Sequence, residues 1–144
     1  MDEQPRERHL IVINDDKGTR PIALEAATYS LGRDESNAIV LYCKTVSRQH
    51  SILLRVPYPA TKGYRYRLID GNSEGKPSAN GTTVNNERCS SRNLEDGDIV
   101  GFGDVRALYS IVVMTESEFK RHTETIDFRS IKAQPVNTDE TLLY

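Results

Sequence analysis

The 144-residue sequence has no tryptophan, two cysteines and three histidines, and these low counts exclude several classes of protein. Cys43 and Cys89 are too few to stabilise a small domain through disulfides, so we expect a reducing, cytoplasmic setting. The histidines and cysteines are also too far apart in the sequence for a metal site. We therefore expect neither a metal nor a cofactor.

Long apolar runs are missing from the sequence as well. Hydrophobic residues make up 37% of the chain, and no stretch reaches the roughly 18 uninterrupted apolar residues of a membrane span. The first ten residues, MDEQPRERHL, are charged where a secretion signal has an apolar core. We expect no membrane partner and no export by that route.

Charge is unevenly distributed along the sequence. The net charge is −2, yet residues 44–92 contain nine Lys and Arg against three Asp and Glu. A basic segment inside an acidic chain can attract a phosphate group or an acidic peptide. Solvated strand faces would give the same count, so charge alone leaves both interpretations open. Aromatic residues do not alternate with the basic ones at the predicted loops, so we do not expect nucleic-acid binding.

Short runs of strand-forming residues alternate with turn residues along most of the chain. The predicted strands are His9–Ile13, Pro21–Leu24, Thr28–Leu31, Ala38–Leu41, Ser51–Val56, Tyr64–Ile69, Thr82–Val84, Asp98–Phe102 and Ala107–Met114. Residues 64–68 alternate between apolar and basic side chains, which is typical of a half-buried strand. We expect an all-β fold, a sandwich of two antiparallel sheets over residues 9–114, after an N-terminal extension over residues 1–8.

A short helix and a tail are predicted after the sandwich. Thr115-Glu116-Ser117-Glu118 has the form of a capping box, which predicts a helix within residues 115–122. Residues 123–144 contain little continuous apolar sequence, so we expect a flexible tail. Acidic residues flank four of its threonines, which makes them candidate phosphorylation sites: Thr123, Thr125, Thr138 and Thr141.

Four short motifs fall at predicted turns. They are Gly32-Arg33, Ser47-Arg48-Gln49-His50, Asn80-Gly81-Thr82 and Gly101-Phe102-Gly103. Loops at one end of a sandwich can bring distant positions together. Arg33, Ser47 and Asn80 would then offer a planar guanidinium, a hydroxyl and an amide, which suit a phosphate and an extended peptide backbone. The motifs contain no carboxylate, which favours anion binding over general acid–base catalysis.

The order and spacing of these motifs resemble those of the forkhead-associated (FHA) domain family. The resemblance covers residues 9–114 and includes the Leu-Glu-Asp-Gly-Asp segment at 94–98. It implies a module that binds phosphothreonine-containing proteins or peptides through an arginine cluster. The implied role is that of an adaptor or sensor downstream of a Ser/Thr kinase. The chain's own tail, once phosphorylated, is a further candidate ligand.

The resemblance also implies a role for individual residues. Arg33 and Ser47 match phosphate-contacting positions, and Arg48 matches a variable position that often adds a phosphate or peptide contact. Asn80 matches the position that bonds the ligand's main chain beside the phosphothreonine. Four residues match architectural positions around the binding loops: Gly32, His50, Gly81 and Thr82.

One position departs from the family pattern. Family members often have Ser or Thr where this chain has Ala79, so one phosphate donor is missing unless Ser78 or Arg48 replaces it.

A sandwich that binds partners or oligomerises without phosphate is the alternative function. Hydrolysis through Ser47 and His50 is disfavoured because no positioned acid is recognisable. We therefore expect a binding module with no catalytic residues.

Overall fold

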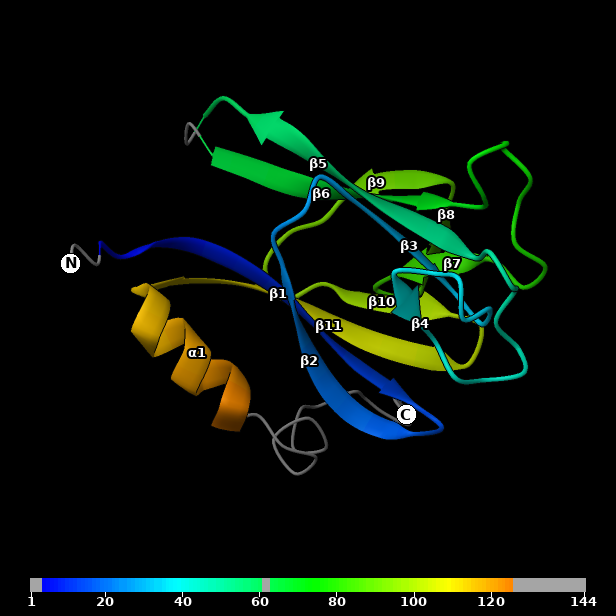
Figure 1. Cartoon of the computed structure of the whole chain (residues 1–144). Coiled ribbons are helices and arrows are strands. Elements are labelled where there is room, and N and C mark those ends of the chain that lie inside the picture. The colour runs from blue at the N-terminus through cyan, green and yellow to red at the C-terminus, as the bar shows by residue number, and fades with distance from the viewer. Residues whose placement is uncertain (1–3, 61–62, 126–144) are drawn as a thin grey trace.

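A computed structural model describes residues 4–60 and 63–125 of the chain. Within these residues, eleven strands form two sheets that pack face to face, and one helix follows the last strand (Figure 1). The six-stranded sheet has the order β2-β1-β11-β10-β7-β8, and the five-stranded sheet has the order β4-β3-β5-β6-β9. The predicted all-β sandwich is thus confirmed.

The strand bounds are as follows. The six-stranded sheet contains β1 (Arg6–Asp15), β2 (Gly18–Leu24), β7 (Thr82–Val84), β8 (Glu87–Cys89), β10 (Ile99–Phe102) and β11 (Val105–Met114). The five-stranded sheet contains β3 (Thr28–Gly32), β4 (Ile39–Val40), β5 (Ser51–Tyr58), β6 (Gly63–Asp70) and β9 (Ser91–Asn93).

The structure differs from the predicted strands in three respects. β1 begins at Arg6, inside the expected N-terminal extension, because Arg6 pairs with Met114 of β11. β8 and β9 were not predicted, since their residues are mostly exposed and polar and give no apolar alternation. β3 and β4 pair in parallel, although the sheets were expected to be antiparallel. β4 is only two residues long and follows a loop rather than a tight hairpin turn, so its direction is not set by a hairpin.

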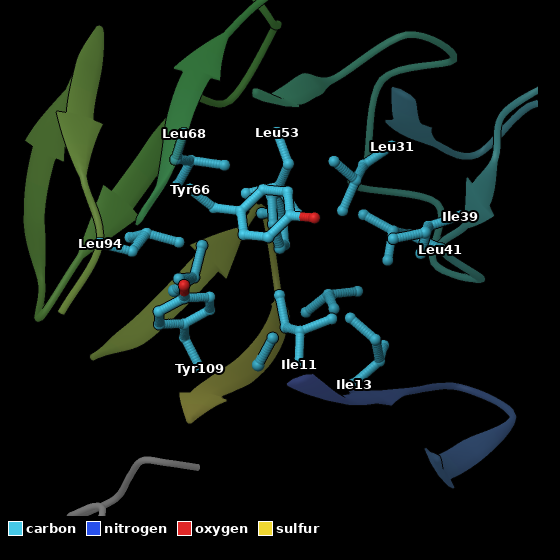
Figure 2. Close-up of a cluster of buried hydrophobic side chains, with 14 of the residues drawn as sticks. Ile11, Ile13, Leu31, Ile39, Leu41, Leu53, Tyr66, Leu68, Leu94 and Tyr109 are labelled. Carbon is cyan, nitrogen blue, oxygen red and sulfur yellow. The ribbon is translucent and has the colours of Figure 1, made fainter. Parts of the chain in front are cut away.

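The core lies between the two sheets (Figure 2). Ile11 and Ile13 of β1 enter it from one sheet, and Leu53 and Leu68 enter it from the other, where they are cross-strand partners on β5 and β6. Alternate residues of these strands point inward because strand side chains alternate between faces. Burying each such side chain contributes about 1.5–3 kcal/mol. This rigid sandwich fixes the strand ends from which the loops emerge.

The helix α1 (Glu116–Thr125) closes the outer face of the six-stranded sheet. The capping box is formed: the main-chain N of Glu118 donates to Thr115 Oγ1 at 3.1 Å, and the main-chain N of Thr115 donates to Glu118 Oε1 at 2.9 Å. Phe119 packs on Leu10 and Val12. No helix within residues 4–60 and 63–125 is long and apolar enough to cross a membrane.

The helix is longer than predicted, because its cap and its buried phenylalanine anchor a full ten-residue segment. Thr123 and Thr125 therefore lie within α1 rather than in a flexible tail. Thr138 and Thr141 lie outside the described residues.

Candidate functional site

Three loops meet at one end of the sandwich and bring the predicted site residues together. The main-chain N of Arg33, just after β3, donates to the Ser47 carbonyl oxygen at 3.0 Å. The main-chain N of Ala79, before β7, donates to Ser47 Oγ at 2.8 Å. Asn80 Nδ2 donates to the carbonyl oxygen of Thr45 at 2.7 Å. Residues from three distant parts of the sequence thus surround Ser47.

Arg33 lies on an exposed turn and is held in place by its own loop neighbours. Its Nε donates to the carbonyl oxygen of Val46 at 2.9 Å, which leaves the two Nη groups for a ligand. A methyl group at Gly32 would overlap the carbonyl oxygen of Arg48, so only glycine permits this close approach between the Arg33 loop and the Arg48 loop.

Ser47 is half-buried at the centre of the three loops. Its hydroxyl oxygen accepts the hydrogen bond from Ala79, so the hydroxyl proton remains available to donate. The Ser47 main-chain N donates to His50 Nδ1 at 3.0 Å. The serine is therefore fixed on both its main chain and its side chain, with its proton unused by either contact.

His50 is fully buried and joins two of the loops. Because Nδ1 accepts from Ser47, Nε2 carries the proton and donates to the carbonyl oxygen of Gly81 at 2.9 Å. Burial lowers the pKa of His50, although the Gly81 carbonyl and Asp70 oppose that shift. Both ring nitrogens bond main-chain atoms and neither bonds the Ser47 hydroxyl, so the pair lacks the contact that activates a serine nucleophile.

The turn at residues 78–81 presents Asn80 to solvent. Gly81 adopts a φ of 86°, in the left-handed region that favours glycine. The bond to Thr45 uses one Nδ2 proton of Asn80, so the second proton and Oδ1 can meet the donor and acceptor of a peptide main chain.

Asp70, at the end of β6, supports this turn from below, and the sequence analysis missed it. Its Oδ1 accepts hydrogen bonds from Ser78 Oγ and Thr82 Oγ1, each at 2.6 Å. Burial opposes ionisation of Asp70, but these hydrogen bonds outweigh it and lower the pKa of its carboxyl. Asp-Gly is a common turn pair, but no motif in the sequence connects Asp70 with the hydroxyls of Ser78 and Thr82.

Ser78 cannot replace the donor missing at Ala79. Its hydroxyl donates to Asp70 and accepts from the main-chain N of Gly81 at 2.9 Å, and the residue is buried. Both bonds of the hydroxyl are made to Asp70 and Gly81 rather than to a group at Ser47, so Arg48 is the remaining candidate for a compensating contact.

Asn37 is a second supporting residue that the sequence did not reveal. It is buried, and its Nδ2 donates to the carbonyl oxygens of Asp34 and Arg48, each at 2.7 Å. These bonds hold the Arg33 loop against the main chain of Arg48. The residue after the Gly101-Phe102-Gly103 motif also supports the site, because the main-chain N of Asp104 donates to Thr45 Oγ1 at 2.9 Å.

The site carries uncompensated positive charge. Arg33 and Arg48 are both exposed, and neither forms an ion pair with any residue in the described part of the chain. The side chain of neighbouring Asp34 instead accepts from the main-chain N of Ser36 at 3.3 Å. Two guanidinium groups without ion pairs, a serine hydroxyl and an amide on braced loops have the chemistry to hold an anion and the main chain of a peptide.

The sequence pattern of the FHA domain matches residues 29–103, a segment that holds every residue of this site. The chain belongs to the FHA domain family. The uncharacterized protein sll1895 of Synechocystis is 31% identical over 103 residues, which cover 71% of this chain and 15% of that protein. The chain thus spans a small part of this relative's length.

Solved structures share the fold. The Slr1951 protein from Synechocystis is 31% identical, with a TM-score of 0.67, and the match covers 71% of this chain and 96% of that one. A second structure comes from a structural and functional study of phosphothreonine-dependent FHA domain interactions. It is 26% identical, with a TM-score of 0.58, and the match covers 72% of this chain and 95% of that one.

Proposed function

We propose that this FHA domain binds phosphothreonine-containing proteins or peptides and acts as an adaptor or sensor in Ser/Thr kinase signalling. The observation that carries the proposal is the meeting of three loops around Ser47. Within the described residues, no hydrogen bond uses the Ser47 hydroxyl proton or the Nη groups of Arg33, and neither Arg33 nor Arg48 forms an ion pair. The phosphothreonine-dependent interactions of the related FHA domain support the same ligand.

Different residues bind the phosphate and the main chain of the peptide. Arg33 supplies a planar pair of donors to two phosphate oxygens, Ser47 donates its hydroxyl proton, and Arg48 adds charge in place of the donor missing at Ala79. Asn80 bonds the main chain of the ligand beside the phosphothreonine through its amide. Gly32, His50, Gly81 and Thr82 hold these groups in position. The domain acts by binding, with no step of catalysis.

The proposal includes the cellular compartment of the domain and the source of its ligand. The low cysteine count favours a reducing, cytoplasmic setting, where the domain would bind a partner protein phosphorylated by a Ser/Thr kinase. The chain's own threonines are a second source of ligand. A phosphorylated Thr138 or Thr141 would present the same chemistry to Arg33 of its own chain or of a second copy, and so would compete with other ligands.

The test is a binding screen with peptide libraries that have phosphothreonine, phosphoserine or threonine at a fixed central position. The proposal predicts measurable binding to the phosphothreonine library and weaker binding to the phosphoserine library. Binding to the threonine library should be undetectable. Equal binding to the phosphorylated and unphosphorylated libraries would instead establish a phosphate-independent scaffold.

A further inference from the structure

A polar row crosses the outer face of the six-stranded sheet, next to the site but outside it. Strand pairing aligns Arg88 of β8 with Thr83 of β7, Thr83 with Gly101 of β10, and Gly101 with Arg106 of β11. The residues next to this row in the sequence include the core residues Val84, Val100 and Ala107. Because strand side chains alternate, the row itself faces away from the core.

The two arginines of this row lie over glycine main chain. A methyl group at Gly81 would lie 2.6 Å from Arg88 Nε and 2.9 Å from its Nη2. A methyl group at Gly101 would lie 3.0 Å from Arg106 Nη1 and would overlap Thr83 Oγ1. The guanidinium of Arg88 therefore lies directly beside the Asn80–Gly81 turn, on the surface that continues from the site.

Within the described residues these arginines also lack negative partners, unlike Arg20 and Arg92. Arg20 pairs with Asp15 at 3.0 Å and Arg92 with Glu87 at 3.4 Å. Within the described residues, Arg88 is exposed and forms no ion pair, while Arg106 donates only to the carbonyl oxygens of Gly103 at 2.9 Å and Val105 at 3.2 Å. The row thus presents unneutralised positive charge and a threonine hydroxyl.

The Asn80–Gly81 turn lies between this row and the proposed phosphate site at Ser47. On one side, Ala79 and Asn80 bond Ser47 and Thr45. On another side, Arg88 covers Gly81. A peptide held by Asn80 advances about 3.3 Å per residue in extended conformation, so a residue two to four positions from the phosphothreonine can reach Arg88.

We propose that Arg88, with Thr83 and Arg106 beside it, forms a subsite for an Asp or Glu side chain of the phosphopeptide. A carboxylate matches the planar donor pair of a guanidinium. This inference rests on the proposed function and adds to it a preference for an acidic residue two to four positions from the phosphothreonine.

The experiment compares the wild-type domain with Arg88→Gln and Arg88→Glu in a phosphothreonine peptide library that is degenerate at the flanking positions. The wild type should enrich Asp and Glu at one of these positions, and replacement of that residue by its amide should weaken binding about threefold to tenfold. In Arg88→Gln this difference should vanish, and Arg88→Glu should favour Lys at the same position. Arg88→Gln keeps a side chain long enough to cover Gly81, so the turn stays packed.

Arg67→Gln is the matched control, because Arg67 is an exposed arginine on β6 of the other sheet, bonded to Asn93 Oδ1 at 2.8 Å. It should leave the acidic preference unchanged. Phosphothreonine-dependent binding with no acidic preference, or with a preference that survives both Arg88 variants, would overturn the subsite alone. No phosphothreonine-dependent binding at all would overturn the proposed function together with the subsite.

Discussion

At the scale of single residues, the site depends on side chains that no ligand touches. Asp70 accepts two hydroxyl hydrogen bonds and so holds both Ser78 and Thr82 behind the Asn80 turn. Asn37 holds the Arg33 loop against the main chain of Arg48, because its Nδ2 donates to the carbonyl oxygens of Asp34 and Arg48. Arg33 and Asn80 can present their groups in a fixed geometry because these supporting side chains restrict the loops.

Asp70→Asn should weaken both the fold and ligand binding. An amide oxygen at the Oδ1 position could still accept from both hydroxyls, but the NH2 group would then face the main-chain N–H of Ser78, which donates to Oδ2 at 3.2 Å in the wild type. The substitution also removes the negative charge that strengthens these hydrogen bonds. We expect a loss of about 1–3 kcal/mol in the free energy of unfolding and a reduced affinity for a phosphothreonine peptide. Denaturant titration and calorimetry measure the two effects. Asp16→Asn, at an exposed turn, is the control and should change neither; unchanged peptide affinity in Asp70→Asn would contradict the positioning role.

The buried His9 on β1 should make the free energy of unfolding depend on pH. Burial lowers its pKa to about 4, with Glu7 opposing the shift and Arg65 adding to it. The unfolded chain therefore takes up a proton near pH 6.5 while the folded chain does not, so stability is full above pH 6.5 and is lost as pH falls toward 4. The full effect is about 3 kcal/mol.

His9→Phe should reduce the slope of unfolding free energy against pH over that window. Some slope should remain, since the pKa of His50 is also lowered by burial. The measurement is denaturant unfolding at several pH values, with slopes rather than absolute stabilities compared, because the variant also loses the hydrogen bond to Tyr109. An identical slope in variant and wild type would contradict the assignment.

At the scale of elements, sequence reasoning succeeded where a segment has its own local signal. The alternation of residues 64–68 predicted β6, and Thr115 with Glu118 predicted the start of α1. It failed for β8 and β9, whose exposed polar residues are ordered by pairing with β7 and β6. That pairing is a tertiary effect, and local propensity does not encode it.

The same distinction applies to the site. Gly32, Arg33, Ser47 and Asn80 stand in recognisable motifs, and the structure brings them together. The direction of the Ser78 hydroxyl, by contrast, depends on Asp70, eight residues earlier in the chain. Such partnerships depend on how two loops pack and therefore appear only in the folded chain.

The capping box of α1 gives a prediction confined to one element. Thr115→Ala removes the hydroxyl that accepts from the main-chain N of Glu118 and should lower the free energy of unfolding by about 1 kcal/mol. Phosphopeptide affinity should not change, because α1 lies away from the end of the sandwich where β3 leads into the site (Figure 1). A double-mutant cycle with Glu118→Ala should show coupling between the two residues. Strict additivity would argue against a reciprocal cap.

At the scale of the whole molecule, a sandwich carries on its loops two exposed arginines that form no ion pair within the described residues, although the chain as a whole is acidic with a net charge of −2. Arg33 is exposed, and its side chain bonds only the Val46 carbonyl within the described residues. In contrast to Asp70, Arg33 should therefore affect binding without affecting the stability of the fold.

The most direct test of this account is the affinity of Arg33→Ala and Arg33→Lys for a phosphothreonine peptide that the wild type binds. Charge-assisted hydrogen bonds contribute about 1.5–3 kcal/mol each, so Arg33→Ala should weaken binding at least tenfold with an unchanged unfolding transition. Arg33→Lys should be nearly as weak, because an ammonium cannot reproduce the planar donor pair. Wild-type affinity in a folded Arg33→Ala variant would contradict the assignment of the phosphate site.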